Sequence, residues 1–210
     1  MRVNLKINTK DFVKNILDGI NADLKARVKS IRKPVKEKIA ALIERELVAS
    51  HTVKSLILGQ IRHDFGLTVE KAENAVISMI SYMSKNIQIL SKFNKTSTTI
   101  TINLLPIDKE FIESIVGGKF TSYKNGIPTG IVDWADWLIT KGTQVVITGF
   151  HEETDAANSG RSGGNTIMKS GGIFRVEPQH AGTEDDNFIT RAIYPKAEAI
   201  LQIVFDEITR

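Results

Sequence analysis

The residues best suited to metal chemistry are His151, Glu152, Glu153 and Asp155, which lie close together in the sequence. Imidazole and carboxylate groups bind divalent cations, and a metal-bound water is the nucleophile of many hydrolases. A site of this kind needs carboxylates that converge in a constrained geometry, which a polar run does not supply. We therefore expect a solvated acidic loop, with no metal and no cofactor. A metal-dependent hydrolase built on His151, Glu152 and Asp155 stays as an alternative.

The other histidines show no spacing typical of a metal pair. His51 and His63 are twelve residues apart on expected helices, whereas two ligands on one helical face lie about one turn apart. His180 precedes Ala-Gly-Thr, and we expect it to anchor a turn. Neither pattern predicts catalysis.

A run of small residues at 159–164, SGRSGG, has the composition of a phosphate-binding loop. It lacks the Gly-Lys-Ser/Thr ending of such loops, and the chain has no Gly-x-Ser-x-Gly elbow. Without a nucleophile–base pair, acyl transfer has no support, and we predict that the chain is not an enzyme. Small residues supply conformational freedom, so residues 151–164 are predicted to be mobile, with Arg161 available to contact a partner.

A basic segment covers residues 25–38, where the only acidic residue is Glu37. Its seven cations are Lys25, Arg27, Lys29, Arg32, Lys33, Lys36 and Lys38. Such a segment is a solvated helix face, a docking surface for an acidic protein, or a contact for phosphate backbones. The segment lacks aromatic residues for base stacking, so nucleic-acid binding rests on charge alone. A DNA-binding protein that uses residues 25–38 is an alternative function.

Charge is also divided along the whole chain. Residues 1–93 hold 17 Lys and Arg against nine Asp and Glu, a net charge of +8, whereas residues 94–210 hold 11 against 15, a net of −4. Such asymmetry favours contact with nucleic acid or with a partner of opposite charge. The absence of cysteine excludes disulfides, and we expect a soluble protein without a signal peptide or a membrane span.

Hydrophobic periodicity predicts an α+β fold with a basic helical region at 1–93 and an α+β domain at 94–210. Pro34 is expected to begin a helix whose apolar stripe ends at Leu47, and Ser50 and Thr68 are expected N-caps. Alternating residues predict strands at 98–104 and 143–150. Residues 166–169 and 173–176 are expected to form a hairpin around Gly171-Gly172, within a longer loop and hairpin at 151–176.

An apolar stripe from Ile193 to Ile208 predicts a C-terminal helix. We expect this helix to pack on a small, mostly antiparallel sheet, with Phe188 and Phe205 fixing it there. Trp134 and Trp137 are three apart in an expected helix at 131–139, and they suit either the core or an interface. The residues expected at interfaces are Trp134, Trp137, Arg161, Met168, Phe174, His180 and Arg191.

The region from Trp134 onward combines several motifs in a fixed order. They are a WxxWL helix ending at Gly142, a strand, the loop and strand SGRSGGNTIM, Gly182-Thr183, Phe188, Arg191-Ala192 and the C-terminal stripe. This order resembles the neck proteins of long-tailed bacteriophages, of the tail-completion or head–tail joining class. The basic helical N-terminal region is compatible with that class.

The resemblance implies a structural virion subunit without catalytic residues. It implies a homo-oligomeric ring of six or twelve copies, contacts with other neck, portal-adaptor or tail proteins, and assembly in the bacterial cytoplasm without a membrane. Contact with packaged DNA through the basic segment stays open. A tail terminator or a baseplate-proximal protein is an alternative within the same class.

Overall fold

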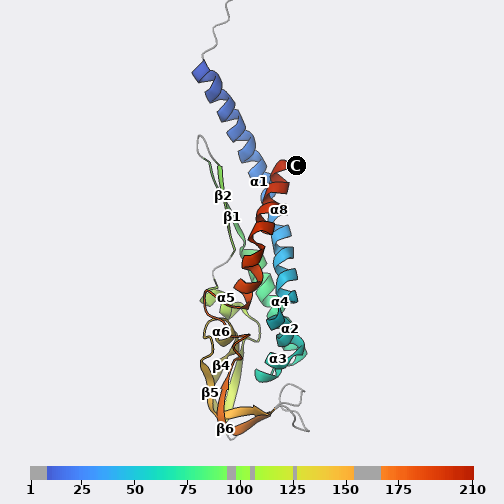
Figure 1. Cartoon of the computed structure of the whole chain (residues 1–210), viewed down its shortest axis with the longest axis vertical. Helices are drawn as coiled ribbons and strands as arrows, with labels where there is room; N and C mark the ends of the chain where they lie inside the picture. The colour runs from blue at the N-terminus through green and yellow to red at the C-terminus, as the bar shows by residue number, and fades with distance from the viewer. Residues whose placement is uncertain (1–8, 94–97, 105–106, 125–126, 154–166) are drawn as a thin grey trace, which may run out of the picture.

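The computed structural model describes residues 9–93, 98–104, 107–124, 127–153 and 167–210. The molecule is elongated, and its longest element is the helix α1 (Thr9–Ala49), which projects beyond the body at one end (Figure 1). The strands β5 (Val145–Glu153) and β6 (Ile167–Arg175) lie at the opposite end. The two ends of the molecule therefore present different structures, a helix and a strand pair.

Helix α1 is continuous through Pro34, so the prediction that Pro34 begins a new helix was wrong. Proline inside a helix removes one backbone hydrogen bond. Here an unbroken stripe of buried side chains crosses that position, with Ile31 before it and Val35 and Ile39 after it. Burial of this stripe against the rest of the chain offsets the cost of the proline.

Three shorter helices follow α1, namely α2 (His51–Leu58), α3 (Gln60–Asp64) and α4 (Val69–Asn86). Helices α2 and α4 pack beside α1, and α3 packs against α2. Both predicted N-caps are confirmed. The Ser50 hydroxyl accepts the Val53 N–H at 3.3 Å, and the Thr68 hydroxyl accepts the Lys71 N–H at 3.3 Å. These caps set where α2 and α4 begin.

The described strands pair as three separate antiparallel two-stranded sheets. These are β1 (Gln88–Phe93) with β2 (Thr98–Asn103), β3 (Lys119–Lys124) with β4 (Ile127–Asp133), and β5 with β6. Two short helices, α5 (Lys109–Ser114) and α6 (Trp134–Ile139), lie between the strand pairs in the sequence. The predicted strands at 98–104 and 143–150 are confirmed, with shifted ends.

The Gly171-Gly172 hairpin was predicted wrongly, because β6 runs unbroken through both glycines and pairs with β5. Gly171 and Gly172 have φ of 94° and 87°, and Gly149 on the facing strand has φ of 81°. Left-handed glycines of this kind produce a bulge, and the register shifts between Thr148 and Phe150. The glycines therefore bend a strand pair instead of closing a turn.

The chain ends in α7 (Phe188–Ile193), a 3₁₀ turn (Tyr194–Lys196) and α8 (Ala197–Thr209). The α+β fold class, with a helical N-terminal part and a C-terminal helix, is confirmed. The partner of the C-terminal helix differs from the prediction, because α8 packs mainly along α1. Lys38 Nζ on α1 lies 2.6 Å from Glu207 Oε1 on α8, which ties the two helices together.

One hydrophobic core connects the two predicted regions of the chain. It contains Ile39 and Leu47 from α1 together with Trp134, Phe188 and Ile200 from the second region. The helices α1 and α4 therefore share buried surface with α6, α7 and α8.

The role predicted for Phe205 was wrong, because its side chain is 61% exposed, whereas Phe188 is buried. The side chains that fix α8 are Ile200 and Val204. We expect Phe205→Ala to lower the free energy of unfolding by less than about 1 kcal/mol, as is usual for exposed positions. Urea denaturation measures this change, and a loss of about 3 kcal/mol or more would contradict the exposed position of Phe205.

Candidate interaction surfaces

Helix α8 and the 3₁₀ turn before it expose three large apolar side chains, which we call the α8 stripe. They are Tyr194 just before the helix, Leu201 and Phe205, exposed by 69%, 64% and 61%. Leu201 and Phe205 are four residues apart and lie on one flank of α8. The neighbouring face, with Ile200 and Val204, is buried in the core. Exposed Glu198 and Asp206 lie on the same helix. The stripe is an apolar surface that the subunit itself does not cover.

The N-terminal part of α1, residues 9–27, forms what we call the tip. Within the described part of the tip no side chain is buried, and the first buried residue of α1 is Val28. Ile20 is 50% exposed. In the sequence, Phe12 and Ile16 precede Ile20 at intervals of four residues. A projecting helix that has an apolar repeat in its sequence, and no buried residue among its described side chains, is typical of an assembly element, because helices gain most stability by packing.

Most cations of the basic segment hold α1 to its own subunit. Arg27 Nη1 donates to the Ile208 carbonyl (3.3 Å), Arg32 Nη2 to Ser91 Oγ (3.1 Å), Lys36 Nζ to the Lys85 carbonyl (2.7 Å) and Lys38 Nζ to Glu207 (2.6 Å). The Lys38 contact lowers the pKa of the Glu207 carboxyl from its ordinary value. Lys25, Lys29 and Lys33 are exposed at intervals of four residues and form a row along α1.

Trp134 is a core residue, so its predicted interface role was wrong. Its side chain is fully buried, its Nε1 donates to the Gly117 carbonyl at 2.6 Å, and its ring lies 5.5 Å from that of Phe65. Trp137 is only partly buried, and its interface role stays a prediction. The two indoles differ because α6 turns one face toward the core.

His180 is also buried, at 2% exposure, which corrects its predicted place at an interface. Its Nδ1 lies 3.1 Å from the Thr52 hydroxyl, and its ring stacks on His51 with centroids 5.0 Å apart. Its backbone N–H donates to the Glu177 carbonyl at 2.9 Å. The expectation that His180 anchors a turn is confirmed, since these contacts attach the turn at 177–183 to α2.

We expect the stability of the protein to fall as the pH drops below neutral, because His180 is held in its neutral form. Burial lowers the pKa of His180, the nearby His51 lowers it further, and Glu177 acts in the opposite direction. Burial likewise lowers the pKa of His63. A lowered pKa means that the unfolded chain binds the proton more readily. The stabilisation is complete above the ordinary histidine pKa of about 6.5 and is lost as the pH falls toward the folded pKa.

Urea denaturation at about pH 7.5 and about pH 5.5 measures this dependence. His180→Gln keeps a polar side chain and removes the titrating group, so we expect a smaller decrease in that variant. His63 would then account for the remainder. An equal decrease in the wild type and in His180→Gln would contradict this role of His180.

Arg191 stabilises the loop that precedes α7. Its guanidinium bonds Asp186 through Nε (2.6 Å) and Nη2 (2.9 Å), and Nη2 also donates to the Ala181 carbonyl (3.2 Å). Arg191 lowers the pKa of the Asp186 carboxyl through these hydrogen bonds. The side chain is 41% exposed, so its predicted contact with a partner stays a prediction beside this role within the subunit.

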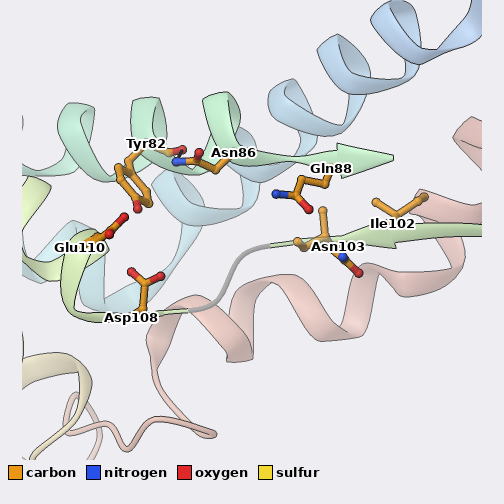
Figure 2. A pocket seen from close by; sticks show the side chains of 8 residues that line it. Tyr82, Asn86, Gln88, Ile102, Asn103, Asp108 and Glu110 are labelled. Carbon is orange, nitrogen blue, oxygen red and sulfur yellow. Dashed lines mark hydrogen bonds between the residues drawn. The ribbon is translucent and has the colours of Figure 1, made fainter. Parts of the chain in front are cut away.

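A groove of about 670 Å³ lies between the end of α4, the pair β1–β2 and the start of α5 (Figure 2). Tyr82 and Glu110 lie close together on one wall, and Asp108 lies near them. Burial and then the charges of Asp108 and Glu110 raise the pKa of Tyr82 above its ordinary value, so the phenol, which is protonated at neutral pH in any case, is still harder to ionise. Asp108 caps α5 by accepting the Phe111 N–H at 2.8 Å. The groove therefore combines a protonated phenol with a structural carboxylate.

The strands β5 and β6 contain several other predicted site residues. Met168 pairs with Glu152 and Phe174 with Ile147 in the backbone register. Arg161 and Asp155 lie outside the described residues, as does most of the predicted mobile loop at 151–164. Among the residues that the structure describes, no group of three or more His, Asp or Glu side chains is placed to hold a metal ion.

Comparison with known proteins adds no assignment. No protein-family profile, no curated protein and no solved structure matches the chain. None of the described helices is long and apolar enough to cross a membrane.

Proposed function

We propose that this protein is a structural subunit that acts by assembly and not by catalysis. The observation that carries this proposal is the exposed apolar surface of the tip and of the α8 stripe. Ile20, Leu201 and Phe205 are each at least half exposed. Exposed apolar surface of this kind is typical of protein–protein contact sites. The strand pair β5–β6 at the other end supports the same conclusion. A two-stranded pair by itself is only marginally stable in water, so packing against a partner would stabilise it.

Within this class we propose a subunit of the neck of a tailed phage, which joins head and tail. The sequence motifs from Trp134 to Ile208 support this assignment, and so does the elongated form with contact elements at both ends. An elongated subunit can contact one neighbour at the tip and another at β5–β6. A tail terminator or a baseplate-proximal protein would use the same surfaces.

Purified virions of a phage that encodes this chain provide the test. We expect the protein to remain with the particles through density-gradient purification and to be labelled by specific antibody at the junction of head and tail. Label at the distal tail end would favour the baseplate alternative. Absence from purified particles would contradict the structural role.

A second candidate function is DNA contact, which the row of Lys25, Lys29 and Lys33 favours. These three side chains are exposed, whereas Lys38 is held by Glu207. Successive members of the row are about 6 Å apart along the helix axis, from the rise of about 1.5 Å per residue. Such a row suits a phosphate backbone through charge alone.

Charge reversal tests the DNA candidate. If α1 binds DNA, Lys25→Glu, Lys29→Glu and Lys33→Glu together should weaken binding at low salt by at least about tenfold and reduce its salt dependence. Lys109→Glu, on α5, is the control for a general loss of positive charge. Equal DNA binding by the triple variant and the wild type would exclude the row as a DNA contact.

A further inference from the structure

The geometry points to head-to-tail self-association, in which the tip of one copy lies on the α8 stripe of a second copy. This inference goes beyond the proposed function, because it concerns how two copies of the chain meet, whether or not they belong to a virion. It joins two exposed apolar elements, one containing Ile20 and the other containing Leu201 and Phe205.

The tip of a given copy cannot cover the stripe of that same copy. Arg27 Nη1 contacts the Ile208 carbonyl near the end of α8, and from there the tip continues away from α8 (Figure 1). Because α1 is one continuous helix from Thr9 to Ala49, the tip would have to break from α1 and reverse direction to reach Leu201. A tip that covers the stripe must therefore come from another molecule.

The two elements match in spacing, and the tip is longer than the helix that it would cover. At about 1.5 Å per residue, the 13 residues of α8 span about 20 Å, and the 19 residues of the tip about 28 Å. Leu201 and Phe205 are four residues apart, and the sequence of the tip repeats apolar residues at the same interval up to Ile20. Apolar side chains at this interval form the ridges that interlock when two helices pack.

Charge bears on the orientation of this contact. Glu198 and Asp206 are exposed on α8 and supply negative charge beside the stripe. The outer end of the tip has exposed Lys14, with Lys10 and Asp11 about one turn before it in the sequence, whereas exposed Asp18 and Asp23 lie nearer the body. Opposite charges at the rim of an apolar contact help to set its orientation, so we place the outer end of the tip beside the acidic residues of α8.

A second copy fits this surface better than an unrelated partner, because each chain carries one tip and one stripe. A repeated contact of this kind uses both surfaces of every interior copy and leads to a ring or a filament. A single contact between two short helices is smaller than a standard interface of about 800 Å² per partner, so one pair associates weakly. We therefore expect association that rises steeply with protein concentration.

Sedimentation equilibrium of the full chain tests the inference with two variants at exposed positions. One is Ile20→Asp in the tip, and the other combines Leu201→Gln with Phe205→Ser in the stripe. We expect the wild type to associate and each variant to have a dissociation constant at least about tenfold higher, the loss of about 1.4 kcal/mol of contact energy. Leu58→Ser, at a side chain 75% exposed on α2, is the control and should associate like the wild type.

Mixing the two variants gives the sharper result. The Ile20→Asp chain keeps its stripe and the double variant keeps its tip, so an equimolar mixture should form a dimer with one chain of each kind and grow no further. A tip–tip or stripe–stripe contact would not recover on mixing. Circular dichroism that matches the wild type would show that both variants fold.

Three results would overturn the inference. These are a wild-type chain that stays monomeric, either variant associating like the wild type, and a mixture that forms no dimer. None of these results bears on the presence of the protein in virions, so failure here is distinguishable from failure of the proposed function.

Discussion

Trp134→Ala should destabilise the protein by about 3–5 kcal/mol, the cost of removing a large aromatic side chain from a core. The indole is fully buried and lies 5.5 Å from the ring of Phe65. Its Nε1 also donates to the Gly117 carbonyl at 2.6 Å, so truncation leaves that carbonyl without this donor. Urea denaturation followed by circular dichroism measures the change in the free energy of unfolding.

Two further substitutions separate the contributions to this effect. Trp134→Phe keeps most of the ring and removes the N–H, so we expect a smaller loss of about 1–3 kcal/mol. Trp137→Ala acts at a partly buried position in the same helix and should cost less than Trp134→Ala. Equal losses for Trp134→Ala and Trp137→Ala would contradict the distinction between a core and a surface indole.

Gly182→Ala should destabilise the protein by about 2–4 kcal/mol, through overpacking of about 1–3 kcal/mol and partial loss of a helix cap of about 1 kcal/mol. A Cβ at this position would lie 2.5 Å from Asn187 Cβ and 2.9 Å from the Leu138 carbonyl oxygen. Asn187 caps α7 by accepting the N–H groups of Ile189 and Thr190 at 3.0 and 3.1 Å. The new methyl group therefore displaces either the cap or α6.

Gly19→Ala is the matched control for Gly182→Ala, because a Cβ at Gly19 meets nothing within 4 Å. Gly19 lies inside α1, where alanine is favoured over glycine by about 0.5–1 kcal/mol. We expect Gly19→Ala to leave the protein as stable as the wild type or slightly more stable. A Gly182→Ala variant with wild-type stability would contradict the close packing of Gly182 against Asn187 and the Leu138 carbonyl.

The sequence predicted those elements that depend on only a few neighbouring residues, namely helix caps and an alternating strand. The caps Ser50 and Thr68 and the strand from Thr98 were correctly placed, because a cap or an alternating strand is encoded within a few residues. Pro34 misled the prediction because its local preference for a helix start is overridden by the buried stripe on both sides of it. The prediction of a hairpin turn at Gly171-Gly172 was wrong because glycines with positive φ occur in bulges as well as in turns.

The arrangement of the surfaces could not be predicted in the same way. Lys38 meets Glu207, and His51 stacks on His180, across more than a hundred residues of sequence. The basic segment therefore looked like an open surface, although several of its cations bond within the subunit. The stripe from Ile193 to Ile208 was visible in the sequence, but its division into a buried face and an exposed flank with Phe205 depends on where α1 lies.

The proposed joining role is tested most directly by an amber mutation in the gene for this chain, in a phage that encodes it. Lysates from a non-suppressing host, viewed by negative-stain microscopy, should contain DNA-filled heads beside separate, complete tails. Full-length protein from a plasmid should restore joined particles, and protein with Leu201→Gln and Phe205→Ser should restore fewer of them. Normal infectious particles in the amber lysate would contradict the joining role and make DNA contact through Lys25, Lys29 and Lys33 the leading interpretation.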